Sequence, residues 1–190
     1  MFPLPTFNLF MKTLFVPLLV LVFLISSCKA LQVSDRNSDG YFEASKKAVT
    51  KVSVPYELDK NKALILVTDH DFVKGMVGKI GFFGEVITFE DLEKSIIKDN
   101  KQEEIGPISG RIGLSNVYKK YKKFLSLTIE FNDKRNKIKL KLINPETFDE
   151  IMVAETEFDT VMAGVYDRNT YNPLFNSLID YIKGNSETFK

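Results

Sequence analysis

Apolar residues recur along this chain with two different periods, which together predict strands and helices. The run Ala63–Val67 is continuously apolar and bounded by polar residues, as is typical of a strand buried on both faces. Glu85–Ile87 predicts a second strand. Phe72–Ile80, between the two, is predicted to form a short helix that Gly75 and Gly78 weaken.

The second half of the chain has the clearest strand pattern. Apolar residues alternate with polar ones on both sides of the turn Asn132–Asn136, and a further strand follows the turn Asn144–Thr147. The pattern predicts a three-stranded antiparallel meander, with Leu125, Leu127, Ile129, Phe131, Ile138, Leu140 and Leu142 on shared sides and a last strand through Ile151–Ala154.

Capping residues indicate where the predicted helices begin. Thr88, followed three residues later by Asp91, resembles a capping box. Asn172, before Pro173, is expected to cap the last helix, with Gly184 after its end. Helices are expected at Tyr41–Val52 and at Phe89–Lys98. After a loop at Gly106–Gly113, a further helix is expected from Ser115 to about Phe124. The last helix, after Asn172, has an apolar stripe formed by Leu174, Phe175, Leu178, Ile179 and Ile182.

The order of elements is strand, helix, strand, helix, helix, meander and helix. Helices around an early buried strand, followed by a meander, predict an α/β or α+β fold. We expect a small mixed sheet that ends in an antiparallel three-stranded meander and is packed by helices. Residues 41–190 are long enough to form a single globular domain with its own core.

The N-terminal segment has the pattern of an export signal. Lys12 precedes a mostly apolar run, Thr13–Ile25, which is interrupted by Pro17. A membrane-spanning helix needs about 20 apolar residues, so this shorter run favours a secretory signal over a retained helix. Because residues 1–10 carry no charge, we expect the physiological start at Met11.

The end of that run, Ile25-Ser26-Ser27-Cys28, resembles the lipobox of bacterial lipoproteins. The resemblance implies that the signal peptide, residues 1–27, is removed and that Cys28 becomes an acylated first residue carrying palmitate or a similar chain. Residues 28–40 would then be a lipidated tether. One acyl chain anchors weakly, whereas the two or three chains implied by the resemblance anchor stably. The broader expectation is a lipid anchor in a bacterial cell envelope. If the source is Gram-negative, Lys29 in place of Asp implies the outer membrane, on its periplasmic side or its outer side, rather than retention at the inner membrane.

Composition narrows the chemistry of the remaining chain. Without the leader, 25 basic and 25 acidic residues remain, so no nucleic acid partner is indicated. With Cys28 acylated, no disulfide and no thiol nucleophile is left, and one histidine excludes multi-histidine metal sites. We therefore expect no cofactor.

The predicted meander also has a remote resemblance. Phe124–Glu155, with its strand-turn-strand run Leu140–Thr147, is similar to the periplasmic α/β domain of the curli-secretion channel lipoprotein and of the lipoprotein activators of penicillin-binding proteins. The resemblance implies an α/β fold in the envelope, and no functional residue transfers with it.

Residues 35–43 resemble an EF-hand calcium loop. Asp35, Asn37 and Asp39 occupy the first, third and fifth ligand positions, and Gly40 the sixth. The twelfth position requires a bidentate Glu, and Lys46 stands there instead. No metal is therefore expected, and the stretch predicts a solvated tether that ends in a turn.

The run Asp69-His70-Asp71 stands at the carboxyl end of the buried strand, where sites gather in open α/β sheets. It resembles the first motif of haloacid-dehalogenase-type phosphatases, which implies Asp69 as the nucleophile, Asp71 as the acid that manages the leaving-group proton, and magnesium. Thr68 interrupts the apolar lead, and the later motifs of that family are not found in order. His70 lacks a serine partner. The alternative is that these acids cap the helix that begins at Phe72.

Two further surfaces are candidates for binding. Lysines on a predicted helix and on one sheet face would form a basic patch for anionic lipid, glycan or an acidic partner if the helix and the hairpin lie side by side. They would otherwise form a solvated face balanced by acids such as Glu130 and Glu146. Aromatic and basic residues before the last helix suit recognition or a local turn network. The candidate binding residues are Lys119, Lys120, Lys137, Lys139, Lys141, Tyr166 and Arg168.

These observations favour a membrane-anchored envelope lipoprotein that acts as a non-catalytic binding or assembly module. Its expected partners are the lipid bilayer, through Cys28, and an envelope protein or an anionic glycan or lipid. A magnesium-dependent phosphohydrolase using Asp69 and Asp71 is the first alternative. A structural envelope protein is the second.

Overall fold

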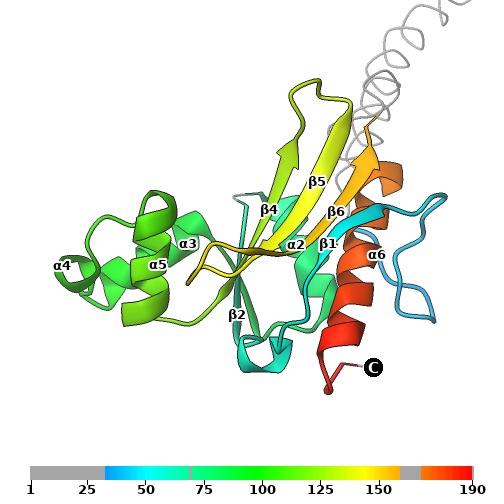
Figure 1. Cartoon of the computed structure of the whole chain (residues 1–190). Helices are drawn as coiled ribbons and strands as arrows, with labels where there is room; N and C mark the ends of the chain where they lie inside the picture. Colours follow the sequence, from blue (N-terminus) through cyan, green and yellow to red (C-terminus); the bar gives the residue numbers. More distant parts are fainter. Residues whose placement is uncertain (1–32, 69, 159–167, 190) are drawn as a thin grey trace, which may run out of the picture. The chain divides into compact units, whose positions relative to one another are not determined.

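The computed structural model describes residues 33–68, 70–158 and 168–189, which belong to one compact unit. The expectations at Cys28, Asp69 and Tyr166 lie outside these residues. Within them, helices pack on both faces of a mixed sheet (Figure 1), and the predicted α/β class is confirmed.

The sheet has six strands in the order β1-β6-β5-β4-β2-β3. Strand β2 runs parallel to both of its neighbours, β3 and β4. The remaining pairs, β4 with β5, β5 with β6 and β6 with β1, are antiparallel, which confirms the predicted meander. The strands span Val49–Ser53 (β1), Leu64–Val67 (β2), Glu85–Thr88 (β3), Leu125–Phe131 (β4), Lys137–Ile143 (β5) and Glu150–Glu157 (β6).

The connections between the parallel strands place helices on opposite faces of the sheet. Helix α2 links β2 to β3 and packs with α6 over one face; α3, α4 and α5 link β3 to β4 and pack over the other. This reversal makes the end of β2 a topological switch point. The helices span Leu58–Lys60 (η2, a 3-10 turn), Asp71–Ile80 (α2), Phe89–Lys98 (α3), Gln102–Ile105 (α4), Gly110–Lys120 (α5) and Arg168–Asn185 (α6).

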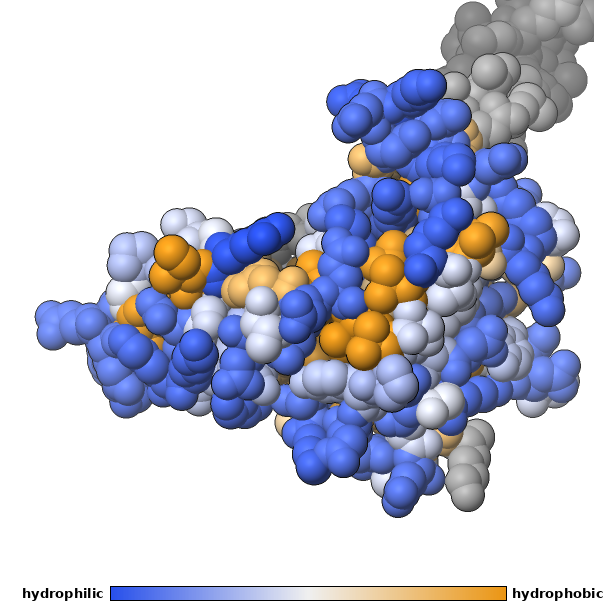
Figure 2. Space-filling model, in the orientation of Figure 1, coloured by the Kyte–Doolittle hydropathy of each residue, from blue (hydrophilic) through white to orange (hydrophobic). Residues whose placement is uncertain are grey.

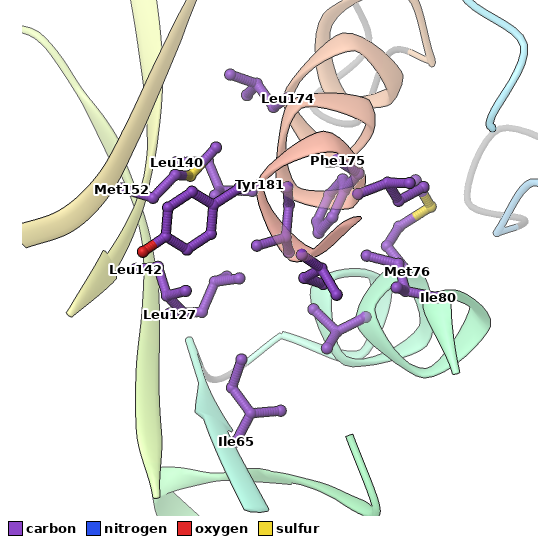
Figure 3. Close-up of a cluster of buried hydrophobic side chains, with 14 of the residues drawn as sticks. Ile65, Met76, Ile80, Leu127, Leu140, Leu142, Met152, Leu174, Phe175 and Tyr181 are labelled. Carbon is purple, nitrogen blue, oxygen red and sulfur yellow. The ribbon is translucent and has the colours of Figure 1, made fainter. Parts of the chain in front are cut away.

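Strand β2 is buried on both faces, as its continuous apolar run predicts. Ile65 and Val67 belong to the larger hydrophobic cluster, under α2 and α6, and Leu64 and Leu66 to a second cluster under α3 and α5. All four side chains are at most 4% exposed. In Figure 3, Ile65 and the β4–β6 residues Leu127, Leu140, Leu142 and Met152 lie opposite Met76 and Ile80 of α2 and Leu174 and Phe175 of α6.

Three predicted elements are wrong. The helix predicted at Tyr41–Val52 is absent: residues 41–48 form no helix, and Val49–Ser53 is strand β1, because its β-branched residues extend along the edge of β6. Helix α5 begins at Gly110 rather than near Ser115. Asn172 lies inside α6, where its side-chain amide donates to the Glu43 carbonyl at 2.7 Å instead of capping the helix.

Candidate functional site

The carboxyl ends of β2 and β3 meet the N-termini of α2 and α3 around an open hollow of about 340 Å³. This is the end of the sheet where the sequence predicts a site. The lining side chains are His70, Asp71, Lys74, Thr88, Glu90 and Asp91.

His70 caps helix α2. Its backbone is extended, and Nδ1 of the imidazole accepts a hydrogen bond from the Phe72 N–H at 3.1 Å. Asp71 is the first helical residue and is exposed, where the positive end of the helix dipole favours a carboxylate. The predicted cap of α2 is therefore present, but the imidazole supplies it.

A capping box holds the N-terminus of α3. The Thr88 hydroxyl accepts from the Asp91 N–H at 3.2 Å, and the Asp91 carboxylate accepts from the Thr88 N–H at 3.0 Å. Lys74 of α2 also donates to Asp91, at 2.6 Å. The lysine hydrogen bond, followed by the bond from Thr88, lowers the pKa of Asp91 to about 2. Asp91 therefore stays ionised at neutral pH and joins the two helices.

The side chains of this hollow thus hold two helix N-termini in place. Across the residues that the structure describes, no group of three or more His, Cys, Asp or Glu side chains is arranged to hold a metal ion. Likewise, no described helix has both the length and the apolarity that a membrane span needs.

The stretch that resembles an EF-hand loop is folded as a turn against the helices. Asp35 forms an ion pair with Lys79 at 2.6 Å, which lowers the pKa of Asp35. The Asn37 side chain accepts hydrogen bonds from the N–H groups of Asp39 and Tyr41 at 3.1 and 3.0 Å. Asp35 and Asn37 are thus engaged with separate partners.

Strands β4, β5, β6 and β1 carry charged as well as apolar side chains on the face opposite the larger hydrophobic cluster. Strand register places Glu130, Lys139, Glu155 and Val49 in one cross-strand row. Thr128, Lys141, Val153 and Val52 form the next row. We call this surface, built by β4, β5, β6 and β1, the open sheet face. Figures 1 and 2, in the same orientation, show apolar groups among hydrophilic ones over these strands.

Glu155 is the centre of the charges on the open sheet face. It is 9% exposed and lies 2.8 Å from Lys137, 3.7 Å from Lys139 and 3.9 Å from Lys51. The hydrogen bond from Lys137 keeps the pKa of Glu155 below its usual value, despite burial. The nearest of these lysines therefore stabilises a carboxylate that is largely removed from water.

Lys141 is held by two carboxylates of the same face. Its Nζ lies 2.8 Å from Glu130 and 2.9 Å from Glu150. Lys137, Lys139 and Lys141 do share one sheet face, as predicted, but acids interleave them. The face therefore presents both signs of charge.

The other predicted binding residues lie elsewhere. Lys120, at the end of α5, donates to the Glu104 carbonyl of α4 at 3.0 Å, and Lys119 beside it is exposed. Arg168 is exposed at the start of α6. Tyr166 lies outside the described residues. Lys120 is thus engaged with α4 rather than with the β4–β5 hairpin.

Comparison with known proteins identifies no relative. No protein-family model, curated protein or solved structure matches this chain. The candidate surfaces therefore stand on their own geometry.

Lys51 and Glu155 belong to this charged cluster, although the sequence pattern did not indicate them as site residues. Glu155 ends an apolar run, and Lys51 lies in a stretch predicted to be helical. Their proximity follows from the pairing of β1 with β6, between residues about a hundred positions apart. The β-branched residues of β1 were the available signal.

Proposed function

We propose that this chain is a lipid-anchored envelope lipoprotein that binds a partner protein without catalysis. The observation that carries the proposal is the open sheet face, where side chains of both charges lie among apolar residues on strands whose other face packs on the larger hydrophobic cluster. Strands fixed in this way present a surface of defined shape and charge, which favours specific recognition. The lipobox-like segment before Cys28 supports the anchor.

The charge pattern favours a protein partner over a polyanionic glycan or lipid. A polyanion would meet the glutamates Glu130, Glu150 and Glu155 together with the lysines. A protein surface can place an acid opposite each lysine and a base opposite each glutamate, so all contacts are attractive. Repulsion between like charges at each glutamate would weaken the binding of a polyanion.

The anchor is tested on natively produced protein. Mass spectrometry should find Cys28 as the first residue, carrying acyl chains, and the protein should partition with membranes. Cys28→Ser should release it into the aqueous fraction. An unprocessed leader, or a bare thiol, would contradict the anchored location.

The binding surface is tested by photo-crosslinking in intact cells. A crosslinker at Thr128, on the open sheet face, should give one discrete adduct with a protein. A matched crosslinker at Glu93, an exposed residue of α3, should not. Lys139→Glu should abolish the adduct while the fold persists. A series of crosslinked products of increasing size would instead indicate a structural envelope protein. Adducts with glycan or lipid would refute a protein partner.

The phosphohydrolase alternative is supported by one observation, the hollow at the switch point beside Asp71. It predicts magnesium-dependent turnover of a phosphate ester, lost on chelation and in Asp69→Asn and Asp71→Asn variants. His70→Asn should leave that turnover intact, because Asn also caps helices. No turnover across a panel of phosphate esters would end this alternative.

A further inference from the structure

Residues 33–43 do not leave the folded unit as a free chain. They run over α2 and α6, and we call them the strap. Its two ends are anchored differently, one by packing against a glycine of α2 and the other by hydrogen bonds to α6.

The first anchor is Val33 against Gly75 in the middle of α2. A Cβ added at Gly75 would lie 2.5 Å from Cγ2 of Val33. Glycine inside a helix costs about 1 kcal/mol relative to alanine, so this position is unfavourable for α2 alone. The close approach of Val33, which packs on the larger hydrophobic cluster, explains why glycine stands there.

A turn of the strap continues along α2. Asp35 pairs with Lys79 at 2.6 Å, one helical turn beyond Gly75. Arg36 and Phe42 form an isolated antiparallel bridge, and the Asn37 side chain closes the turn between them. The strap is thereby a folded hairpin rather than an extended tether.

The second anchor is the end of this hairpin on α6. Phe42 is 1% exposed and packs edge-on against Phe175. The Asn176 side chain accepts a hydrogen bond from the Phe42 N–H and donates one to the Phe42 carbonyl, both at 2.8 Å. The Tyr41 hydroxyl donates to Asp180 at 2.6 Å, and Lys183 lies over the Tyr41 ring. Buried aromatic and amide contacts of this kind hold the strap on the helix.

We propose that the strap fixes which surface of the unit faces the bilayer, namely the α2–α6 side; the inference rests on lipidation of Cys28. Val33 follows Cys28 by five residues, which reach about 17 Å when fully extended. A compact unit of this length has a radius of gyration of about 15 Å. Even at full extension, the residues between Cys28 and Val33 are therefore too few to let the unit turn over.

The consequence concerns the open sheet face. The larger hydrophobic cluster, with α2 and α6, covers one side of the sheet, and the lysine–glutamate rows lie on the other side. With the strap side held to the bilayer, the open sheet face points away from the membrane. It is then presented to a protein in the aqueous compartment.

The test uses the full-length lipidated protein in phospholipid vesicles. Energy transfer is measured to an acceptor lipid from a dye at a single introduced cysteine, either Ser38→Cys in the strap or Glu130→Cys on the open sheet face. Transfer should be more efficient from position 38. Equal efficiencies, or more efficient transfer from position 130, would overturn the proposal.

Two variants separate the strap from the anchor. Twenty Gly/Ser residues inserted after Ala30 give a linker with an r.m.s. length of about 25 Å, which should abolish the difference between the two dyes. Gly75→Val with Asp35→Lys should also reduce it, because both strap contacts to α2 are broken. A difference that survives both changes would refute the strap as its cause. Protein that fails to bind vesicles at all would instead refute the lipid anchor.

Discussion

Gly75 and Gly78 are one turn apart on helix α2 but have different surroundings. A side chain at Gly75 would collide with Val33, whereas nothing lies within 4 Å of a Cβ added at Gly78. Both residues weaken the helix, which the sequence predicts. Only the structure explains why glycine stands at position 75, where a larger residue would collide with Val33.

We predict that Gly78→Ala stabilises the protein by up to about 1 kcal/mol, through helix propensity and a less flexible unfolded chain. Gly75→Ala should lose this gain or destabilise the protein, because the strap must move. Urea unfolding of both variants measures the difference. Equal stabilisation would show that Val33 does not pack closely on α2.

His70 has a side chain that could serve in catalysis, but its observed contact is structural, because the imidazole caps helix α2. We predict that His70→Ala destabilises the protein by about 1 kcal/mol through loss of the α2 cap, and that His70→Asn is nearly neutral. Thermal unfolding of the two variants at neutral pH tests this. If both substitutions are neutral, the imidazole does not cap the helix.

Asp91 makes stability depend on pH in the acid range. Its pKa is lowered to about 2 by Lys74 and Thr88, so the folded state favours the carboxylate more than the unfolded state does. Its stabilising effect is therefore complete above about pH 5 and is lost progressively as the pH falls through 3.8 toward 2. We predict that Asp91→Asn is less stable at pH 5 and has a shallower loss of stability between pH 4 and 2. Because Asp59 also has a pKa of about 2, the measured quantity is the difference from wild type.

At the scale of elements, β2 is the clearest success of the hydrophobic pattern. Four consecutive apolar residues cannot all face one side of a strand, so they require cover on both faces. The start of helix α3 could also be predicted, because its capping box involves residues close in sequence and is present as expected. Elements whose signals lie within a few residues are the ones that the sequence specified.

The double burial of β2 leads to a prediction. Ile65→Ala and Leu66→Ala should each destabilise the protein by about 2–5 kcal/mol, because each leaves a cavity in a different hydrophobic cluster. The two effects should be close to additive to the extent that the two hydrophobic clusters respond independently, because the side chains point to opposite faces of β2. Chemical denaturation of both variants and of the double variant tests this. A small effect of Leu66→Ala would contradict a core under α3 and α5.

Strand β1 and helix α5 show where local signals fail. Val49–Ser53 is a strand because β6 offers it hydrogen-bond partners, and that partner lies a hundred residues away. In α5, Gly113 packs against the backbone of Ile108, so a glycine inside the helix serves a close approach rather than a loop. In both cases, tertiary packing outweighed local propensity.

Over the whole molecule, the two hydrophobic clusters meet at β2 and leave β1 at one edge of the sheet. We predict that amides of β2, β4 and β5 exchange with solvent most slowly and that amides of β1 exchange faster. Residues of β1 are largely exposed, and the strand has one neighbour among the described strands. Native-state hydrogen exchange tests this order. Equal protection of β1 would indicate that another segment covers its edge.

The candidate surfaces also depend on the whole molecule. The alternation of Lys137, Lys139 and Lys141 predicted that they share a face, and they do. Glu130, which the sequence indicated as a balancing acid, does pair with Lys141. The position of Glu155 was not predictable, because it reaches Lys51 and Lys139 only through the register of three strands. Burial makes this arrangement matter, since a carboxylate removed from water needs cations nearby.

The sequence by itself determined the period of each strong element, the double burial of β2, the meander and its turns, and the α/β class. These depend on the spacing of neighbouring residues, which the chain carries locally. Only the tertiary structure decided that β1 is a strand, that Lys74 of α2 joins Asp91 of α3, that the strap packs on Gly75, and that three lysines surround Glu155. Each of these is a contact between distant segments, and its energy exists only once the chain is folded.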